Sequence, residues 1–261
     1  MTATQKYLAD VEDLLDRLYI AADGAGLREE DRRKAIEVAA ILEEVRRTSS
    51  RLSSRSLLVL VDAAAGKSYV GLLAAKLVFA ASGRRASVIT IERDPQRVDA
   101  SRLAAKRLDS NVPVECRRAR VEEEAAWPLK PSIITALHAC GDAADAIIDR
   151  AIACGTRTLL LVPCCTSDAV AASARALAHA DALGIPRQAP VRRRFIQSII
   201  DAERTWRLEA AGYETEVVEF VAPTVTPHNL LWRARLVREP QRMAAAQKAW
   251  TSLMTFPPNS R

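Results

Sequence analysis

The sequence predicts an α/β protein built on a mostly parallel, seven-stranded sheet, with an antiparallel closing hairpin and an N-terminal helical appendage. Three observations predict it. Short apolar, strand-like runs alternate with Ala- and Leu-rich stretches of helical period. Two more strand-like runs follow one another near the C-terminus across a Pro-containing turn. The chain has 261 residues and is 49 % hydrophobic, which suffices for one large core.

Two helices come first. The first carries apolar residues at helical spacing at Leu8, Val11, Leu14, Leu15 and Leu18. The second carries them at Ala35, Ile36, Ala39, Leu42 and Val45. The Ser- and Arg-rich stretch 46–56 then predicts a linker. We therefore expect an N-terminal helical region over residues 1–50, ahead of the main domain.

The alternation of strands and helices begins after this linker. Strands are predicted at 57–62, 86–92, 112–119, 132–139 and 157–163, and helices at 68–82, 95–108, 142–153 and 167–183. Such alternation implies parallel strands with crossover helices. A further helix at 196–211 precedes the antiparallel strands 213–221 and 229–237. We expect the main domain to span 55–238 and a C-terminal helical tail to span 239–261, with its helix at 239–254.

Charge and cysteine content limit the function classes. The net charge of +6 comes from arginines spread over many segments, which is typical of a solvated surface and in some proteins of a polyanion-binding one. Five cysteines form no recognisable disulfide framework, and the chain opens with a polar helix. No apolar run approaches the roughly 20 residues of a membrane span. We expect a reduced, cytoplasmic protein.

The first strand ends in the sequence Asp-Ala-Ala-Ala-Gly-Lys-Ser, residues 62–68, which suggests a phosphate-binding loop. Such a loop needs Gly at its first position so that backbone amides can wrap the phosphates, and Val61 stands there. Asp62 would repel a polyphosphate. An ATPase would also place a magnesium-binding Asp after a later apolar strand, where this chain has His138. These residues favour a ligand without phosphate groups.

The order of elements resembles that of class I S-adenosylmethionine-dependent methyltransferases, whose Rossmann-like sheet binds its ligand beyond the carboxyl ends of the strands. The family loop is roughly Asp-x-Gly-x-Gly-x-Gly. This chain keeps Asp62 and Gly66 and has Ala64 and Ser68 at the other two glycine positions. The resemblance implies S-adenosylmethionine as the cofactor.

The resemblance also implies where the cofactor would bind. Asp62 would meet the methionyl ammonium directly or through water, and Glu92 at the end of the second strand would accept both ribose hydroxyls. Lys67 need not touch the ligand. The adenine would lie near Ala119, Arg120 and Val121. The predicted cofactor-binding residues are Asp62, Ala63, Ala64, Gly66, Tyr69, Glu92, Arg93, Arg120, Val121 and His138.

Downstream segments narrow the resemblance to a subgroup. The chain has His-Ala-Cys-Gly at 138–141, Pro-Cys-Cys at 163–165 and Thr-Pro-His-Asn at 226–229. These are similar to segments of small bacterial methyltransferases of unassigned substrate and, more distantly, of a eukaryotic tRNA 2′-O-methyltransferase family. His228 and Asn229 could contact the acceptor or hold the final hairpin, and turn stabilisation is the stronger interpretation for Asn229.

Two neighbouring strands end in chemistry-bearing residues. His138 and Cys140 follow one strand, and Cys164 and Cys165 follow the next, so parallel geometry should bring them together beside the methyl donor. A structural His and buried thiols that serve only as small hydrophobes are the alternative interpretations. One His and three thiols could bind zinc, but their spacing is not that of paired Cys-x-x-Cys motifs, so we predict no metal.

The candidate catalytic residues are His138, Asp145 and Cys164. Methyl transfer requires that the acceptor be positioned and, for many acceptors, deprotonated, and a neutral imidazole titrates near working pH. Asp145 or Asp142 could orient the acceptor or the base, although Asp142 is better explained as a helix cap. Cys164 follows Pro163, and the nucleophilic Cys of enzymes that methylate C5 of pyrimidines also follows a Pro. A covalent route through Cys164 would need a lowered thiol pKa.

Three functions stay open. The leading one is a methyltransferase with RNA as the slightly favoured acceptor, because of the basic balance and the tRNA-modifying relatives. The second is the same chemistry on a small molecule or peptide, with the N-terminal helices as a lid. The third is a non-catalytic binding module. An Arg/Lys stripe leading to the cleft would favour RNA, and an enclosed apolar cavity would favour a small molecule.

Overall fold

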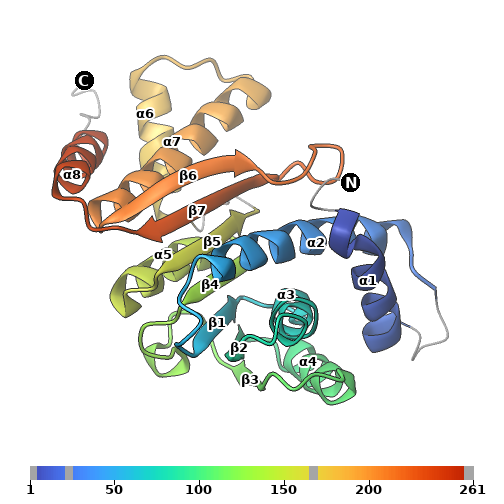
Figure 1. The fold of residues 1–261 in the computed structure, drawn as a ribbon. Coiled ribbons are helices and arrows are strands. Elements are labelled where there is room, and N and C mark those ends of the chain that lie inside the picture. The colour runs from blue at the N-terminus through green and yellow to red at the C-terminus, as the bar shows by residue number, and fades with distance from the viewer. Residues whose placement is uncertain (1–4, 21–25, 165–169, 256–261) are drawn as a thin grey trace.

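The sheet has seven strands in the order β3-β2-β1-β4-β5-β7-β6 (Figure 1). This is a computed structural model, and it describes residues 5–20, 26–164 and 170–255. Strands β1 to β5 are parallel, and β7 runs antiparallel to both β5 and β6. The predicted fold is thereby confirmed. The strands are β1 Leu58–Ala63, β2 Ala86–Glu92, β3 Val114–Arg118, β4 Ile133–Ala139, β5 Thr158–Pro163, β6 Tyr213–Glu219 and β7 Leu230–Leu236.

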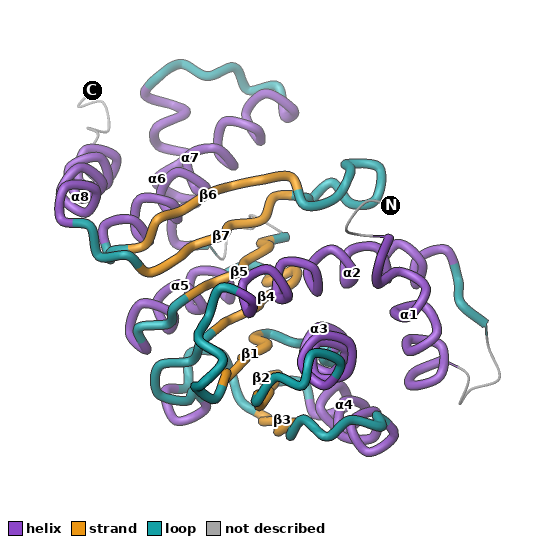
Figure 2. The backbone as a smooth tube through the Cα atoms, in the orientation of Figure 1, coloured by secondary structure: helices purple, strands orange, loops and turns teal. Residues whose placement is uncertain are grey.

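Helices connect and cover these strands (Figure 2). A short π-helical segment, η1, extends α1, another, η3, extends α3, and a 3₁₀ turn, η4, precedes β4. The bounds are α1 Gln5–Leu15, η1 Asp16–Ile20, α2 Glu29–Ser50, α3 Tyr69–Leu73, η3 Ala74–Ala80, α4 Pro95–Arg107, η4 Glu124–Ala126, α5 Ala143–Cys154, α6 Ala171–Ala182, α7 Ala189–Ala210 and α8 Pro240–Met254. Among these described helices, none is long and apolar enough to cross a membrane.

The N-terminal helices belong to the main core. Leu14 of α1 and Leu42 of α2 are buried in the same apolar cluster as Leu60 of β1 and Phe79 of η3, on one face of the sheet. The cluster on the other face joins α5 and α7 to the strands, with Trp232 of β7 buried in it. The helices therefore cover both faces, and the N-terminal region packs on the sheet that carries the predicted cofactor loop.

Helix α2 extends farther than the sequence predicts. It continues to Ser50, into the stretch that was expected to be a linker. The hydroxyls of Ser49 and Ser50 donate hydrogen bonds to the carbonyls of Arg46 and Arg47 one turn earlier. Both arginines also pair with Glu43. These local contacts satisfy polar groups within the helix, so the Ser/Arg composition does not end it.

Helix α7 begins earlier than predicted. It starts at Ala189 with Pro190 in its first turn, where the fixed φ of proline suits a helix start. The basic run 190–195, which lies before the predicted helix start at 196, therefore forms the first turns of this helix.

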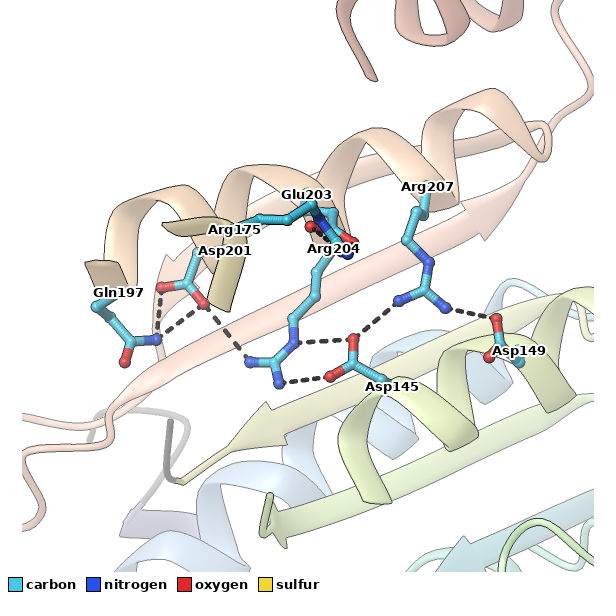
Figure 3. Close-up of polar contacts among 8 residues, drawn as sticks. All are labelled: Asp145, Asp149, Arg175, Gln197, Asp201, Glu203, Arg204 and Arg207. Carbon is cyan, nitrogen blue, oxygen red and sulfur yellow. Dashed lines mark hydrogen bonds and ion pairs between the residues drawn. The ribbon is translucent and has the colours of Figure 1, made fainter. Parts of the chain in front are cut away.

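A buried ion-pair network joins α7 to α5 and α6 (Figure 3). The side chain of Arg204 is 1 % exposed, and its guanidinium donates to Asp145 of α5, with an Nη2–Oδ2 distance of 3.0 Å. Arg207 also donates to Asp145, at 2.8 Å. Glu203 accepts both its hydrogen bonds from Arg175 of α6. Helices α5, α6 and α7 are thus joined by ion pairs as well as by apolar packing.

Candidate active site

The loop after β1 has the backbone of a glycine-rich loop but keeps only one of its three glycines. Ala64, Gly66 and Ser68 have φ values of +51°, +58° and +60°. These are the three positions at which the similar family has Gly. A left-handed conformation costs a residue with a Cβ roughly 1–2 kcal/mol. The surrounding structure therefore holds Ala64 and Ser68 in a backbone shape that their side chains disfavour.

Gly71 allows α3 to lie directly on the strand ends. A Cβ at this position would lie 2.9 Å from the Thr90 Cγ2 atom and 3.1 Å from the Asp62 Cβ atom. The Gly71 amide donates to Asp62 Oδ2 at 2.9 Å. A larger residue would move the helix away from β1 and β2, so Gly71 fixes the position of the loop that precedes it.

Asp62 is buried beneath this helix. Its side chain also accepts a hydrogen bond from Thr135 Oγ1, at 3.4 Å, and the residue is 2 % exposed. Burial raises the pKa of Asp62 to about 7. Both oxygens thus have protein partners, and contact with a ligand ammonium stays a prediction.

The raised pKa predicts a pH-dependent stability. Between about pH 4 and pH 7 the unfolded chain releases this proton while the folded protein keeps it, so stability should fall as pH rises through that window. Asp62→Asn keeps the shape without the titration and should gain stability over wild type, by up to about 4 kcal/mol, between these limits. Urea unfolding at pH 4.5 and pH 7.5 measures the difference. Asp10→Asn, at an exposed site, is the control. A difference independent of pH would contradict the assignment.

Glu92 ties the end of β2 to the loop. Its Oε2 accepts from the Gly66 amide at 2.8 Å and its Oε1 from the Asp94 amide at 2.9 Å. Each carboxylate oxygen has two lone pairs, so each keeps one for a ligand hydroxyl. A Cβ built on Gly66 would meet no atom within 4 Å, so there is open space against this backbone. These features fit a ribose at the position that the resemblance implies.

The N-terminal segment reaches this loop. The Tyr19 hydroxyl donates to the Lys67 carbonyl at 2.9 Å, and the Tyr19 ring meets the Tyr69 ring edge to face, with centroids 4.7 Å apart. Burial raises the pKa of both tyrosines. The Lys67 side chain is exposed, as predicted. Residue Tyr69, predicted to bind the cofactor, is therefore covered by a residue that lies outside the predicted domain.

Backbone amides in the predicted adenine-binding region already donate hydrogen bonds within the protein. The Ala119 amide donates to the Glu92 carbonyl at 3.0 Å, and the Arg120 amide donates to Glu123 Oε1 at 2.7 Å. Val121 is buried, and its carbonyl accepts from the Trp127 indole. Two of the three amides are thus engaged within the protein. Ala63 closes β1 as a buried residue and Arg93 is exposed after β2, so both lie at the predicted strand ends.

His138 stands at the irregular end of β4. Its φ is +62°, and the pairing of β4 with β5 shifts register between Leu137 and Ala139. Its Nε2 lies 2.8 Å from Oε1 of Glu37 in α2. Burial acts to raise the pKa of Glu37, but hydrogen bonds with His138 and Lys34 outweigh it and lower that pKa. An ionised Glu37 accepts, so Nε2 carries the proton and Nδ1 of a neutral His138 keeps its lone pair.

The final hairpin brings a second histidine to this place. Burial and the neighbouring His138 lower the pKa of His228, and Glu37 opposes them. The Asn229 side-chain amide donates to the Val221 carbonyl at 3.0 Å, so its predicted role in stabilising the turn is confirmed. The β6–β7 loop thus faces the end of β4.

The cysteines of the two strand ends meet, as predicted. The structure pairs Cys140 with Cys164 as a disulfide, with Cα atoms 5.4 Å apart, which the sequence did not predict. Both sulfur atoms lie near the His138 carbonyl oxygen, at 3.4 and 3.5 Å. Cys164 could act as a nucleophile only with this pair reduced. Cys165 lies outside the described residues, and within the described ranges no group of three metal-ligating side chains occurs.

Two acidic residues of α5 differ from expectation. Asp142 occupies the predicted N-cap position of α5, but its side chain makes no capping hydrogen bond. Both oxygens of Asp145 accept from arginines of α7. This explains Asp145 as a link between helices, and its catalytic role stays a prediction without a contact at the site in its favour.

Sequence reasoning missed Glu37 and Tyr19. Both come from the N-terminal region and contact the site across 101 and 48 residues of sequence. Periodicity gave no signal for Glu37, because at about 100° per residue it lies roughly 200° around the helix from Ala35, away from the predicted apolar face. Its burial depends on the packing of α2 in the folded protein, which the helix pattern does not show.

Comparisons with known proteins give the fold and the family. No curated protein matches the chain. The methyltransferase PaMTH1 of Podospora anserina, crystallised with S-adenosylhomocysteine, superposes with a TM-score of 0.51 at 12 % identity, over 88 % of this chain and 87 % of that one. The CMeT domain of the citrinin polyketide synthase gives 0.53 at 13 %, over 92 % of this chain and 64 % of that one. These two likenesses show the fold.

A family model described as "Methyltransferase domain" matches residues 33–171, more than half of the chain. The match begins within α2, so the helix that supplies Glu37 lies inside it. The predictions of a methyltransferase and of its cofactor are confirmed. The chain belongs to the methyltransferase-domain family, the enzymes that use S-adenosylmethionine.

Proposed function

We propose that this enzyme methylates RNA, with the cofactor at the carboxyl ends of β1 and β2 and His138 as the general base. The observation that carries the base assignment is the contact between His138 Nε2 and Glu37 Oε1, 2.8 Å apart. His138 lies near the carboxyl end of β4, which pairs with β1, so it is at the same edge of the sheet as the loop that would hold the methyl donor.

The described residues fit the cofactor. Glu92 keeps a lone pair on each oxygen for the ribose hydroxyls, and the Gly66 backbone has open space beside it. A methionyl ammonium near Asp62, in direct contact or through water, would favour the ionised form of this buried carboxyl. S-Adenosylmethionine supplies a methyl group on a sulfonium, which leaves a neutral thioether after transfer.

His138 would take the acceptor's proton. When the acceptor is methylated, its proton would move to Nδ1 of His138. Glu37 holds Nε2–H, which fixes the tautomer and stabilises the imidazolium that forms. Lys34 pairs with the other Glu37 oxygen at 2.7 Å and keeps that carboxylate in place.

The net charge of +6 supports RNA as the acceptor. A second candidate is a small molecule, which is supported by Tyr19 and Glu37, because the N-terminal helices reach over the loop and the base as a lid would. Transfer of tritiated methyl groups from S-adenosylmethionine to total cellular RNA separates the two. Label in material sensitive to ribonuclease is expected. Label confined to small molecules would favour the second candidate.

Glu92 offers a test of the cofactor site. Glu92→Ala should weaken S-adenosylhomocysteine binding by about tenfold or more, because two hydroxyl acceptors are lost, and Glu92→Gln should lose less. Calorimetric titration measures both. Glu219→Ala, a glutamate at the end of β6 and exposed, is the matched control. Unchanged affinity in a folded Glu92→Ala protein would rule out the ribose contact.

A further inference from the structure

A large cavity lies away from the methyl-transfer site. It has a volume of about 1240 Å³ and is lined by the C-terminal turns of α2, the N-terminal ends of β1 and β5, and the paired strands β6 and β7. Ser132 and Thr158 line its floor at the starts of β4 and β5. The cofactor loop and His138 lie at the other ends of these parallel strands. We call this cavity the basic groove.

The basic groove carries a large excess of positive charge. Nine arginine and lysine residues line it, against three glutamates. The glutamates are already neutralised: Arg233 pairs with Glu44 and Glu216, at 2.8 and 3.1 Å, and Arg235 pairs with Glu214. Arg47 and Arg242 also pair with carboxylates outside the groove, and Arg84 donates to backbone carbonyls, so only part of the surplus is available to a ligand.

Four of these cations are exposed and unpaired. Arg51, Lys130, Arg157 and Arg238 are exposed, and no ion pair involves them among the residues that the structure describes. They come from four separate segments, the end of α2, the loop before β4, the start of β5 and the chain after β7. Like charges gathered at one cavity from such distant segments repel one another, and an anionic ligand relieves that repulsion.

We infer that the basic groove binds the phosphate backbone of a double-stranded segment of the RNA substrate. No aromatic residue is among the described residues that line it. Proteins that bind single strands stack bases on aromatic side chains, whereas duplex RNA is held through its phosphates and shape. Protein partners also depend on aromatic anchors, so the lining favours phosphates over an acidic protein segment.

The position of the groove fits a long substrate. The basic groove lies at one end of strands β1 and β4, and the proposed cofactor site lies at the other. These strands have six and seven residues, so about 20 Å separates the two sites at 3.3 Å per residue. A small acceptor cannot occupy both places, but an RNA with a stem beside its methylated nucleotide can. The inference rests on the proposed RNA acceptor. It assigns the binding of that RNA to residues far from the site of methyl transfer.

The test compares two matched triple variants of the full chain. Arg51→Gln/Lys130→Gln/Arg157→Gln removes three groove cations. Lys106→Gln/Arg107→Gln/Arg187→Gln removes one lysine and two arginines that are exposed elsewhere and unpaired within the described residues. Fluorescence anisotropy with a labelled 20-base-pair RNA hairpin is measured from 50 to 300 mM salt, with poly-L-glutamate as a second ligand. Calorimetry with S-adenosylhomocysteine checks that each variant keeps its cofactor site.

The groove variant should bind the hairpin at least about tenfold more weakly, and its log–log salt slope should fall by about 3, because roughly one counterion is released per phosphate contact. The control variant should bind like wild type. Equal hairpin binding by the two variants, or tight binding of poly-L-glutamate without hairpin binding, would overturn the inference. If the hairpin binds as expected but no RNA is methylated, the inference that the groove binds RNA holds and the proposal of RNA as the acceptor fails. If the groove variant methylates RNA fully at low RNA concentration, the inference about the groove fails and the proposed acceptor holds.

Discussion

His138→Asn should lower the rate of methyl transfer by about 10²–10⁴-fold while leaving S-adenosylhomocysteine affinity unchanged. A positioned general base contributes a factor of this size. Asparagine tolerates the left-handed backbone that His138 adopts at φ +62°, so the variant removes the imidazole without adding strain. Single-turnover kinetics with tritiated S-adenosylmethionine, alongside calorimetry, separates the rate from binding.

Two further variants make this result specific. Glu37→Gln should lower the rate less, by about tenfold, and should shift the acidic limb of the pH–rate profile, where His138 must lose its proton to act as the base, because Glu37 acts through His138. His228→Ala removes the neighbouring imidazole and measures how much that second histidine contributes to the rate. An unchanged rate in a folded His138→Asn protein would show that His138 is structural.

Asp145→Ala should lower the free energy of unfolding by about 3–5 kcal/mol. It leaves Arg204, whose side chain is 1 % exposed, with Asp201 at 3.7 Å as its remaining carboxylate. Breaking a buried ion pair costs this much because an uncompensated charge stays behind. Each kcal/mol lowers the Tm of a chain of this size by about 2–4 °C, so a thermal melt reveals the loss.

A double variant tests the cause. Asp145→Ala/Arg204→Met removes the orphaned charge and should recover part of the stability that Asp145→Ala loses. Asp149→Ala is the control, because Asp149 is 65 % exposed and its pair with Arg207 should contribute at most about 1 kcal/mol. If the Asp145 and Asp149 variants melt alike, the network in Figure 3 does not hold α5 to α7.

Elements with strong local signals were predicted closely. Strand β2 spans the predicted residues 86–92, since its apolar, β-branched run is bounded by polar residues on both sides. The predicted end of α2 and the predicted start of α7 were wrong, because the composition of residues 46–50 and 190–195 suggested loops. Hydrogen bonds from Ser49 and Ser50 within the helix, and a Pro that starts α7, override that composition. Such endings depend on contacts that residue type does not fix.

The site was predictable where the parallel sheet determines it. The ends of β1, β2, β4 and β5 meet at one edge, so Asp62, Glu92, His138 and Cys164 could be placed there from the order of elements. The residues that contact them could not be predicted in this way. Glu37 reaches His138 because α2 packs across the sheet, and that placement depends on the tertiary core. Asp145 faces α7 for the same reason.

Isothermal titration of the purified protein with S-adenosylmethionine and S-adenosylhomocysteine, with ATP and magnesium as the control, tests the central claim most directly. The account predicts micromolar binding of both sulfur compounds and none of ATP, because the loop of residues 62–68 lacks the first glycine of a phosphate-binding loop and begins with an aspartate that would repel a polyphosphate. Binding of ATP, or of neither sulfur compound, would contradict it.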